Sequence, residues 1–122
     1  MLITLIILVL AVPIADVETF SLADSMTINL KKDTDGTAHY AVITVTLSLN
    51  KKDEGYKTYQ PMLETNKELI KTTINNVVSE YTYDQITSDQ QQVQDAILEE
   101  LQALYDGSSF IVGVGFSSAT YQ

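Results

Sequence analysis

The sequence contains no cysteine, no tryptophan and no arginine among its 122 residues. Without cysteine, disulfide frameworks and thiolate-ligated zinc or iron–sulfur sites are excluded. Without arginine, the chain lacks the planar fork that binds phosphates and carboxylates through two parallel hydrogen bonds. The net charge of −9 would also repel a nucleic-acid duplex. We therefore expect no nucleic-acid partner.

Positive charge is confined to one part of the chain. The seven lysines all lie within residues 31–71, whereas residues 72–122 hold seven acids and no base. The simpler interpretation is an acidic, solvated surface that keeps a small protein soluble. The alternative is a surface selected for a basic partner.

The segment Met1–Ala15 is almost wholly apolar and carries no charged side chain. As a helix it would span roughly 22 Å, which is short of the ~30 Å hydrocarbon core. We expect a single-span membrane anchor whose upstream basic residues are missing from this chain. The alternatives are a signal peptide with Ala11 or Ala15 before the cut, although no base precedes the run, and a buried strand. Because the first base after the run is Lys31, the domain formed by residues 16–122 is expected on the outer face of the membrane.

The stretch from His39 to Leu49 alternates apolar and polar residues, which predicts a central strand with one buried face. Residues 16–30 predict an extended entry and a strand, with a bend near Ala23–Ser25. The polar loop 31–36 ends in Asp-Gly and should join strand 26–30 to the central strand as a hairpin. Residues 110–121 predict the last strand. A sheet with one apolar face should be antiparallel and covered on one side.

Two helices are expected to cover that face. Residues 50–59 are charged and predict a loop, and Pro61 suits the first turn of a helix. Apolar residues then recur at spacings of three and four residues from Met62 to Tyr81, which predicts an amphipathic helix of about five turns. A capping box formed by Ser88 and Gln91 predicts the start of a second helix, which ends at Asp106-Gly107. Its expected buried residues are Val93, Ala96, Ile97, Leu101, Leu104 and Tyr105. The predicted fold class is α+β: an antiparallel sheet, made of an N-terminal hairpin and a C-terminal strand, covered on one face by two helices, with an N-terminal membrane segment.

Few residues suggest catalysis. The single histidine, His39, could act as a general base, but a structural role at the start of the strand is the simpler interpretation. Glu99 and Glu100 are adjacent on a helix, about 100° apart, and so do not converge as a catalytic pair. Glu100 falls within the apolar arc, either as a carboxylate reaching water at its edge or as a contact to a neighbouring subunit. We expect no catalytic residue, no metal site and no cofactor.

The order of five stretches resembles the FliL family of flagellar basal-body-associated membrane proteins. The stretches are FSLADSMTINL, HYAVITVTLSL, PMLETNKELIKTTINNVVSEYTYDQI, QDAILEELQAL and FIVGVGFSSATYQ. One departure is that the arginine usual ahead of the first helix is replaced by Asn66-Lys67. The resemblance covers nearly the whole chain and implies a stomatin-like extracytoplasmic domain carried by a single membrane span.

The resemblance also implies a function without catalysis. It implies a flagellar accessory protein of the inner or plasma membrane that forms a homo-oligomeric ring, contacts the basal body and supports the stator, and has no small-molecule substrate. The interface candidates on this interpretation are Glu99, Glu100, Phe20 and Leu22. The alternative is a membrane-anchored or secreted small binding module unrelated to motility.

Overall fold

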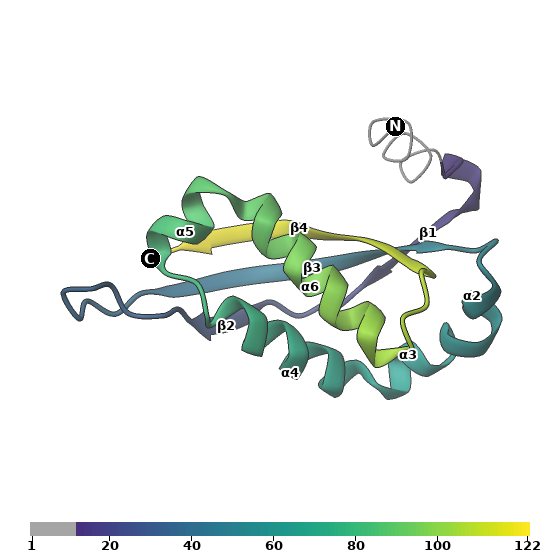
Figure 1. The fold of residues 1–122 in the computed structure, drawn as a ribbon, viewed down its shortest axis with the longest axis horizontal. Coiled ribbons are helices and arrows are strands. Elements are labelled where there is room, and N and C mark those ends of the chain that lie inside the picture. The colour runs from purple at the N-terminus through teal and green to yellow at the C-terminus, as the bar shows by residue number, and fades with distance from the viewer. Residues whose placement is uncertain (1–11) are drawn as a thin grey trace.

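The structure is a computed structural model, and it describes residues 12–122. The sheet is antiparallel, and the longer helices lie over one of its faces (Figure 1). The elements follow in the order η1 (a 3-10 turn, Ile14–Asp16), β1 (Val17–Ser21), β2 (Met26–Asn29), β3 (Tyr40–Asn50), α2 (Glu54–Tyr59), α3 (Met62–Thr65), α4 (Lys67–Val78), α5 (Tyr83–Ser88), α6 (Gln90–Leu104) and β4 (Ile111–Tyr121).

Strand β3 is the centre of the sheet. β1 pairs with residues 46–50 of β3 and β2 pairs with residues 40–43, so β1 and β2 follow one another along the same edge. β4 pairs with residues 41–49 along the opposite edge. The predicted hairpin between the second and third strands is confirmed, as is the bend near Ala23–Ser25, which separates β1 from β2.

The alternation predicted for the central strand is confirmed. The apolar residues of β3 that share one face have no exposed surface: Ala41, Ile43, Val45, Leu47 and Leu49. The residues between them are half-buried or exposed and form the other face. Helices α4 and α6 lie over the first face (Figure 1). The core between the layers contains no buried charged residue among residues 12–122.

The helix expected over residues 62–81 is divided in two. It forms α3 and α4, which meet at Asn66, where φ is −94° and ψ is 14°. Asparagine favours helix ends because its side chain competes with the helical backbone for hydrogen bonds. The division leaves Leu63, Ile70, Ile74 and Val78 in the core, while Met62 and Leu69 are exposed.

Residues 50–59 were expected to form a loop, and this prediction is wrong. They contain the helix α2, which begins after Asp53, whose carboxylate accepts a hydrogen bond from the Gly55 amide at 2.8 Å. A Cβ atom at Gly55 would collide with the Ser108 side chain, so a larger residue here would require that side chain to move. Tyr59 of α2 packs against Tyr105, which follows α6, with the two rings tilted and their centroids 5.3 Å apart. This contact with the second half of the chain stabilises a helix too short to form alone.

The connection expected over residues 81–87 contains the helix α5. Its capping box joins Thr82 and Gln85, whereas the predicted capping box at Ser88 is wrong because Asp89 caps α6 instead. Leu104 of α6 was expected in the core but is 37% exposed. The end of α6 at Asp106-Gly107 is confirmed, with both residues at positive φ.

The last strand is irregular. β4 changes register against β3 between Ser48 and Leu49, which pair with Gly113 and Ile111. Val112, which lies between Ile111 and Gly113, is therefore displaced from the strict alternation expected for residues 110–121. Most of the expected membrane segment, Met1–Ala15, lies outside the described residues. Within residues 12–122, no helix has both the length and the apolar character that crossing a bilayer requires.

Candidate functional site

A groove lies between α4 and α6. Its volume is about 450 Å³, and it is bounded on one side by residues at and just beyond the end of α4 and on the other by residues of α6. The lining residues are Thr73, Asn76, Val77, Glu80, Tyr81, Ala96, Glu99, Glu100 and Leu104. The two walls come from segments about 20 residues apart in the sequence, so the groove depends on the packing of the two helices against the sheet.

Two of the predicted interface residues belong to this groove. Glu99 and Glu100 are both exposed and both line it, although adjacent side chains leave a helix in different directions. Glu80, just after α4, adds a third carboxylate. None of the described residues that line the groove is a lysine. The groove therefore presents acidic groups from both of its sides.

Apolar side chains lie among these acids. Val77, Tyr81, Ala96 and Leu104 line the groove, and Leu104 is 37% exposed. Leu69 lies one helical turn before Thr73 on the same side of α4 and is 51% exposed. The predicted helical stripes counted Leu69 and Leu104 as core residues. The structure instead leaves both at the surface: Leu104 lines the groove, whereas Leu69 lies outside the set of lining residues.

The other two interface candidates lie elsewhere. Leu22 follows β1 and is fully buried in the core. Phe20 is half-buried and packs against the same core. Both side chains therefore have partners within the chain, whereas Glu99 and Glu100 are open to another molecule. The assignment of all four residues to an interface stays a prediction.

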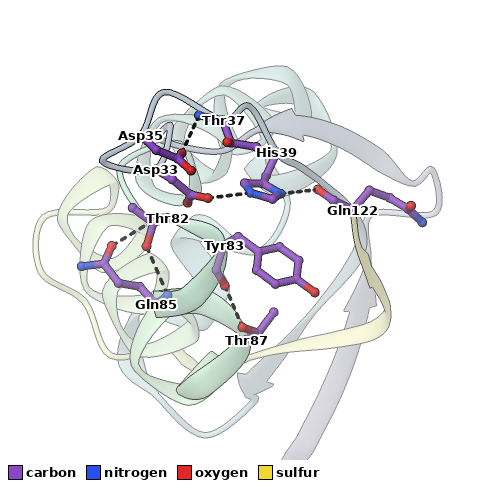
Figure 2. Close-up of polar contacts among 9 residues, drawn as sticks. All are labelled: Asp33, Asp35, Thr37, His39, Thr82, Tyr83, Gln85, Thr87 and Gln122. Carbon is purple, nitrogen blue, oxygen red and sulfur yellow. Dashed lines mark hydrogen bonds and ion pairs between the residues drawn. The ribbon is translucent and has the colours of Figure 1, made fainter.

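His39 joins three parts of the fold (Figure 2). Its Nε2 atom lies 2.8 Å from the Asp33 carboxylate in the β2–β3 loop, and its Nδ1 atom lies 3.1 Å from the main-chain oxygen of Gln122. Its ring packs on Tyr83 of α5, with 4.8 Å between ring centroids. The structural role predicted for this histidine at the start of the central strand therefore has a physical basis.

The contacts of His39 favour its protonated form. Both ring nitrogens face acceptors, and an imidazole can donate from both nitrogens only when it carries a positive charge. The hydrogen bond to Asp33, with smaller effects from Gln122 and the negative charges of Asp33 and Asp84, raises the pKa of His39 above its ordinary value. A raised pKa weakens the case for a general base at neutral pH, since a base must be unprotonated before it reacts.

A second hollow of about 300 Å³ lies next to this histidine. It is lined by Asp33, Thr34, Asp35, Thr82 and Asp84. Asp33 is engaged by His39, and Asp35 accepts a hydrogen bond from the Thr37 amide at 2.9 Å, which lowers the pKa of Asp35. Within residues 12–122, no three carboxylates or histidines are arranged so that they could hold one metal ion together. The hydrogen bonds of Asp33 and Asp35 stabilise the β2–β3 loop that borders the hollow.

The family model described as flagellar basal body-associated protein FliL matches residues 19–122. The chain belongs to the FliL family. No curated protein matches the chain. The match begins within β1 and includes β3, both walls of the groove and β4. The resemblance found in the sequence is thereby confirmed, together with the association of the family with the flagellar basal body.

In this FliL domain, two glutamines of α6 bind main-chain carbonyls in the first half of β4. Gln94 donates to the Val114 carbonyl at 2.7 Å, and Gln102 donates to the Ile111 carbonyl at 2.9 Å. Unpaired strand edges invite pairing with another chain, and side chains that cover them prevent it. The sequence carries little signal for these contacts: Gln94 belongs to the glutamine-rich start of α6, but Gln102 stands alone near its end.

The uncovered face of the sheet has a different character. The register places hydroxyl groups and glycines there, together with Val42, and none of the described residues on this face is charged. Its members include Thr19, Ser21, Thr27, Thr44, Thr46, Ser48, Gly113, Gly115, Ser118 and Thr120. Among the described residues, Glu18 of β1 is the one charged residue in a strand, and its partner Leu49 lies on the opposite, covered face. The other charged residues lie in the loops and helices, where the acidic groove is found.

Proposed function

We propose that this FliL-family chain is a non-enzymatic accessory protein of the flagellar basal body that associates with the stator and supports it. The observation that carries the proposal is the family match over residues 19–122. The exposed groove between α4 and α6 offers a surface on which such a protein could bind a partner. Binding and assembly, rather than chemistry at a catalytic centre, would then be the mechanism.

The proposal includes self-association into a ring on the outer side of the membrane. A heterologous contact, in which two different surfaces of one subunit meet, closes into a ring when its rotation is suitable. The contacts of Gln94 and Gln102 with β4 make residues 111–114 of that strand a poor site for pairing with another chain. The edge formed by β1 and β2, the loops and the helical layer remain as candidate contact regions.

The membrane arrangement can be tested on the full chain. We propose that residues 1–15 form an anchor, because that segment is apolar and carries no charge. The full chain should then remain in the membrane fraction after alkaline extraction and keep its original N-terminus. A mature protein that begins after Ala11 or Ala15 and is released into the soluble fraction would show that the segment is a signal peptide.

Association with the stator can be tested by co-purification. The full chain, tagged at its C-terminus and expressed at its natural level, should recover the stator proteins from mildly solubilised membranes. A tagged, unrelated single-span protein at the same level is the control. Equal recovery of stator proteins by the two would contradict the proposal and favour a binding module unrelated to motility.

A further inference from the structure

The groove between α4 and α6 combines exposed apolar side chains with a rim of carboxylates. Apolar side chains from both walls line it, and one of them, Leu104, is 37% exposed. Three carboxylates surround these apolar groups: Glu80 after α4, and Glu99 and Glu100 on α6. Exposed apolar surface with a charged rim is typical of a protein-binding site.

The charges indicate the kind of partner. Residues 72–122 contain seven acids and no base, so none of the acids on the α6 wall can pair with a lysine of its own segment. Each of the two lysines of α4 already has an acidic partner: Lys67 lies 3.7 Å from Glu64, and Lys71 lies 3.6 Å from Asp24. A ligand that carries positive charge would therefore find three carboxylates that form no ion pair among the described residues.

A second copy of the domain complements this groove poorly. Each of its five remaining lysines lies close to an acid in the sequence: Lys31 and Lys32 precede Asp33, Lys51 and Lys52 precede Asp53, and Lys57 follows Glu54 by three residues within α2. The large exposed apolar residue nearest to these lysines in the sequence is Met62, and it lies in α3, outside the short helix α2 that carries Lys57. The described residues therefore offer no exposed segment in which apolar and unpaired basic side chains alternate at helical spacing.

We propose that the groove between α4 and α6 binds an amphipathic helix of another protein, in which an apolar stripe is flanked by lysines or arginines. The apolar stripe packs on Val77, Ala96 and Leu104, in the manner of helices that bind in grooves through residues spaced at three and four. The basic residues on its borders approach Glu80 on one side and Glu99 and Glu100 on the other. The proposal goes beyond the flagellar role and can hold or fail independently of it.

The absence of tryptophan and cysteine from the chain permits a direct test. The probe is a synthetic helix of about five turns with leucines on one face, lysines on the other and a single tryptophan. The protein is the full chain in non-ionic detergent, with empty micelles as the blank. A spin label attached at Thr73→Cys, in the groove, should quench the tryptophan fluorescence, whereas a label at Thr44→Cys, on the uncovered sheet face, should not.

Variants then separate the groove from general charge attraction. The triple variant Glu80→Gln, Glu99→Gln and Glu100→Gln should weaken binding about tenfold, because three ion pairs are lost. The matched control Glu54→Gln, Glu64→Gln and Glu68→Gln removes the same charge from exposed positions outside the groove, and should change binding by less than about twofold. A peptide of the same composition with its leucines scattered should bind at least about tenfold more weakly than the amphipathic one.

Four results would overturn the proposal. They are equal weakening by the two triple variants, equal binding of the two peptides, quenching from both labelled positions, and no binding of the amphipathic peptide. A fifth result would favour a second copy as the occupant: a change in the oligomeric state of the full chain, measured by sedimentation, caused by the groove triple variant alone. That result would also overturn the proposal.

Discussion

Replacing Val45 by aspartate should unfold the domain, whereas replacing its neighbour Thr44 should not. Val45 lies in the middle of β3, has no exposed surface, and pairs across the sheet with Phe116. Thr44 points to the uncovered face and pairs with Ser118. The two variants add the same charge to adjacent positions of one strand, so they compare the two faces of the sheet directly.

The expected loss of unfolding free energy for Val45→Asp follows from the complete burial of Val45. Removing the valine from the core costs about 2 kcal/mol of unfolding free energy. A buried carboxylate without a partner has its pKa raised by about 3 units, which costs about 4 kcal/mol at neutral pH. The sum of about 6 kcal/mol is as large as the whole stability of many domains. At the Thr44 position the cost should be about 1 kcal/mol or less.

Urea and thermal unfolding of the two variants provide the assay, with Val45→Thr as the control that adds a hydroxyl but no charge. Because the aspartate pKa would be raised in the folded state, the destabilisation should be full at pH 7 and should decrease as the pH falls toward about 4. Equal losses for Val45→Asp and Thr44→Asp would refute the argument, since they would mean that both faces of the sheet are buried.

Three further predictions concern single polar groups. Tyr105→Phe should raise the free energy of unfolding by about 1 kcal/mol, because the buried Tyr105 hydroxyl has no hydrogen-bond partner among the described residues; a loss of stability would contradict this. Gln94→Ala should cost about 1 kcal/mol in urea unfolding, because the Val114 carbonyl loses its partner; an unchanged midpoint would show that the edge contact is not formed. His39→Gln should lower the melting temperature more at pH 6 than at pH 8. The hydrogen bond to Asp33 raises the His39 pKa, so the protonated histidine stabilises the fold at low pH, and this stabilisation is lost as the pH rises through the pKa of the folded state. An equal effect at both pH values would be inconsistent with a charged histidine.

The long strands and helices could be predicted from the sequence because their hydrophobic patterns extend over many residues. The apolar alternation of β3 extends over 11 residues, and the helical spacing of α6 over 15. Burial then follows directly, since a strand or helix with one apolar face must cover it. The short helices α2 and α5 could not be predicted in the same way. Six residues each give too little periodicity, and α2 is stabilised by contacts from Tyr59 to residues far along the chain.

The candidate site was only partly visible in the sequence. Glu100 was identified because a carboxylate within an apolar helical arc is unusual, and the structure places it in the groove. The contribution of α4 could not be predicted, because it depends on which of its apolar residues the sheet leaves uncovered. Leu69 and Leu104 share the helical spacing of core residues, and only the packing of the two helices shows that both remain at the surface.

The measurement that most directly tests the flagellar role is swarm-plate expansion of a strain that lacks this gene, with flagella counted by electron microscopy and the full chain restored from a plasmid as control. If the chain supports the stator, the deletion strain should assemble normal numbers of flagella but expand less, with a larger defect as the agar concentration and the motor load increase. Restoration of the full chain should recover expansion. Normal swarming of the deletion strain at every load would contradict the proposed role.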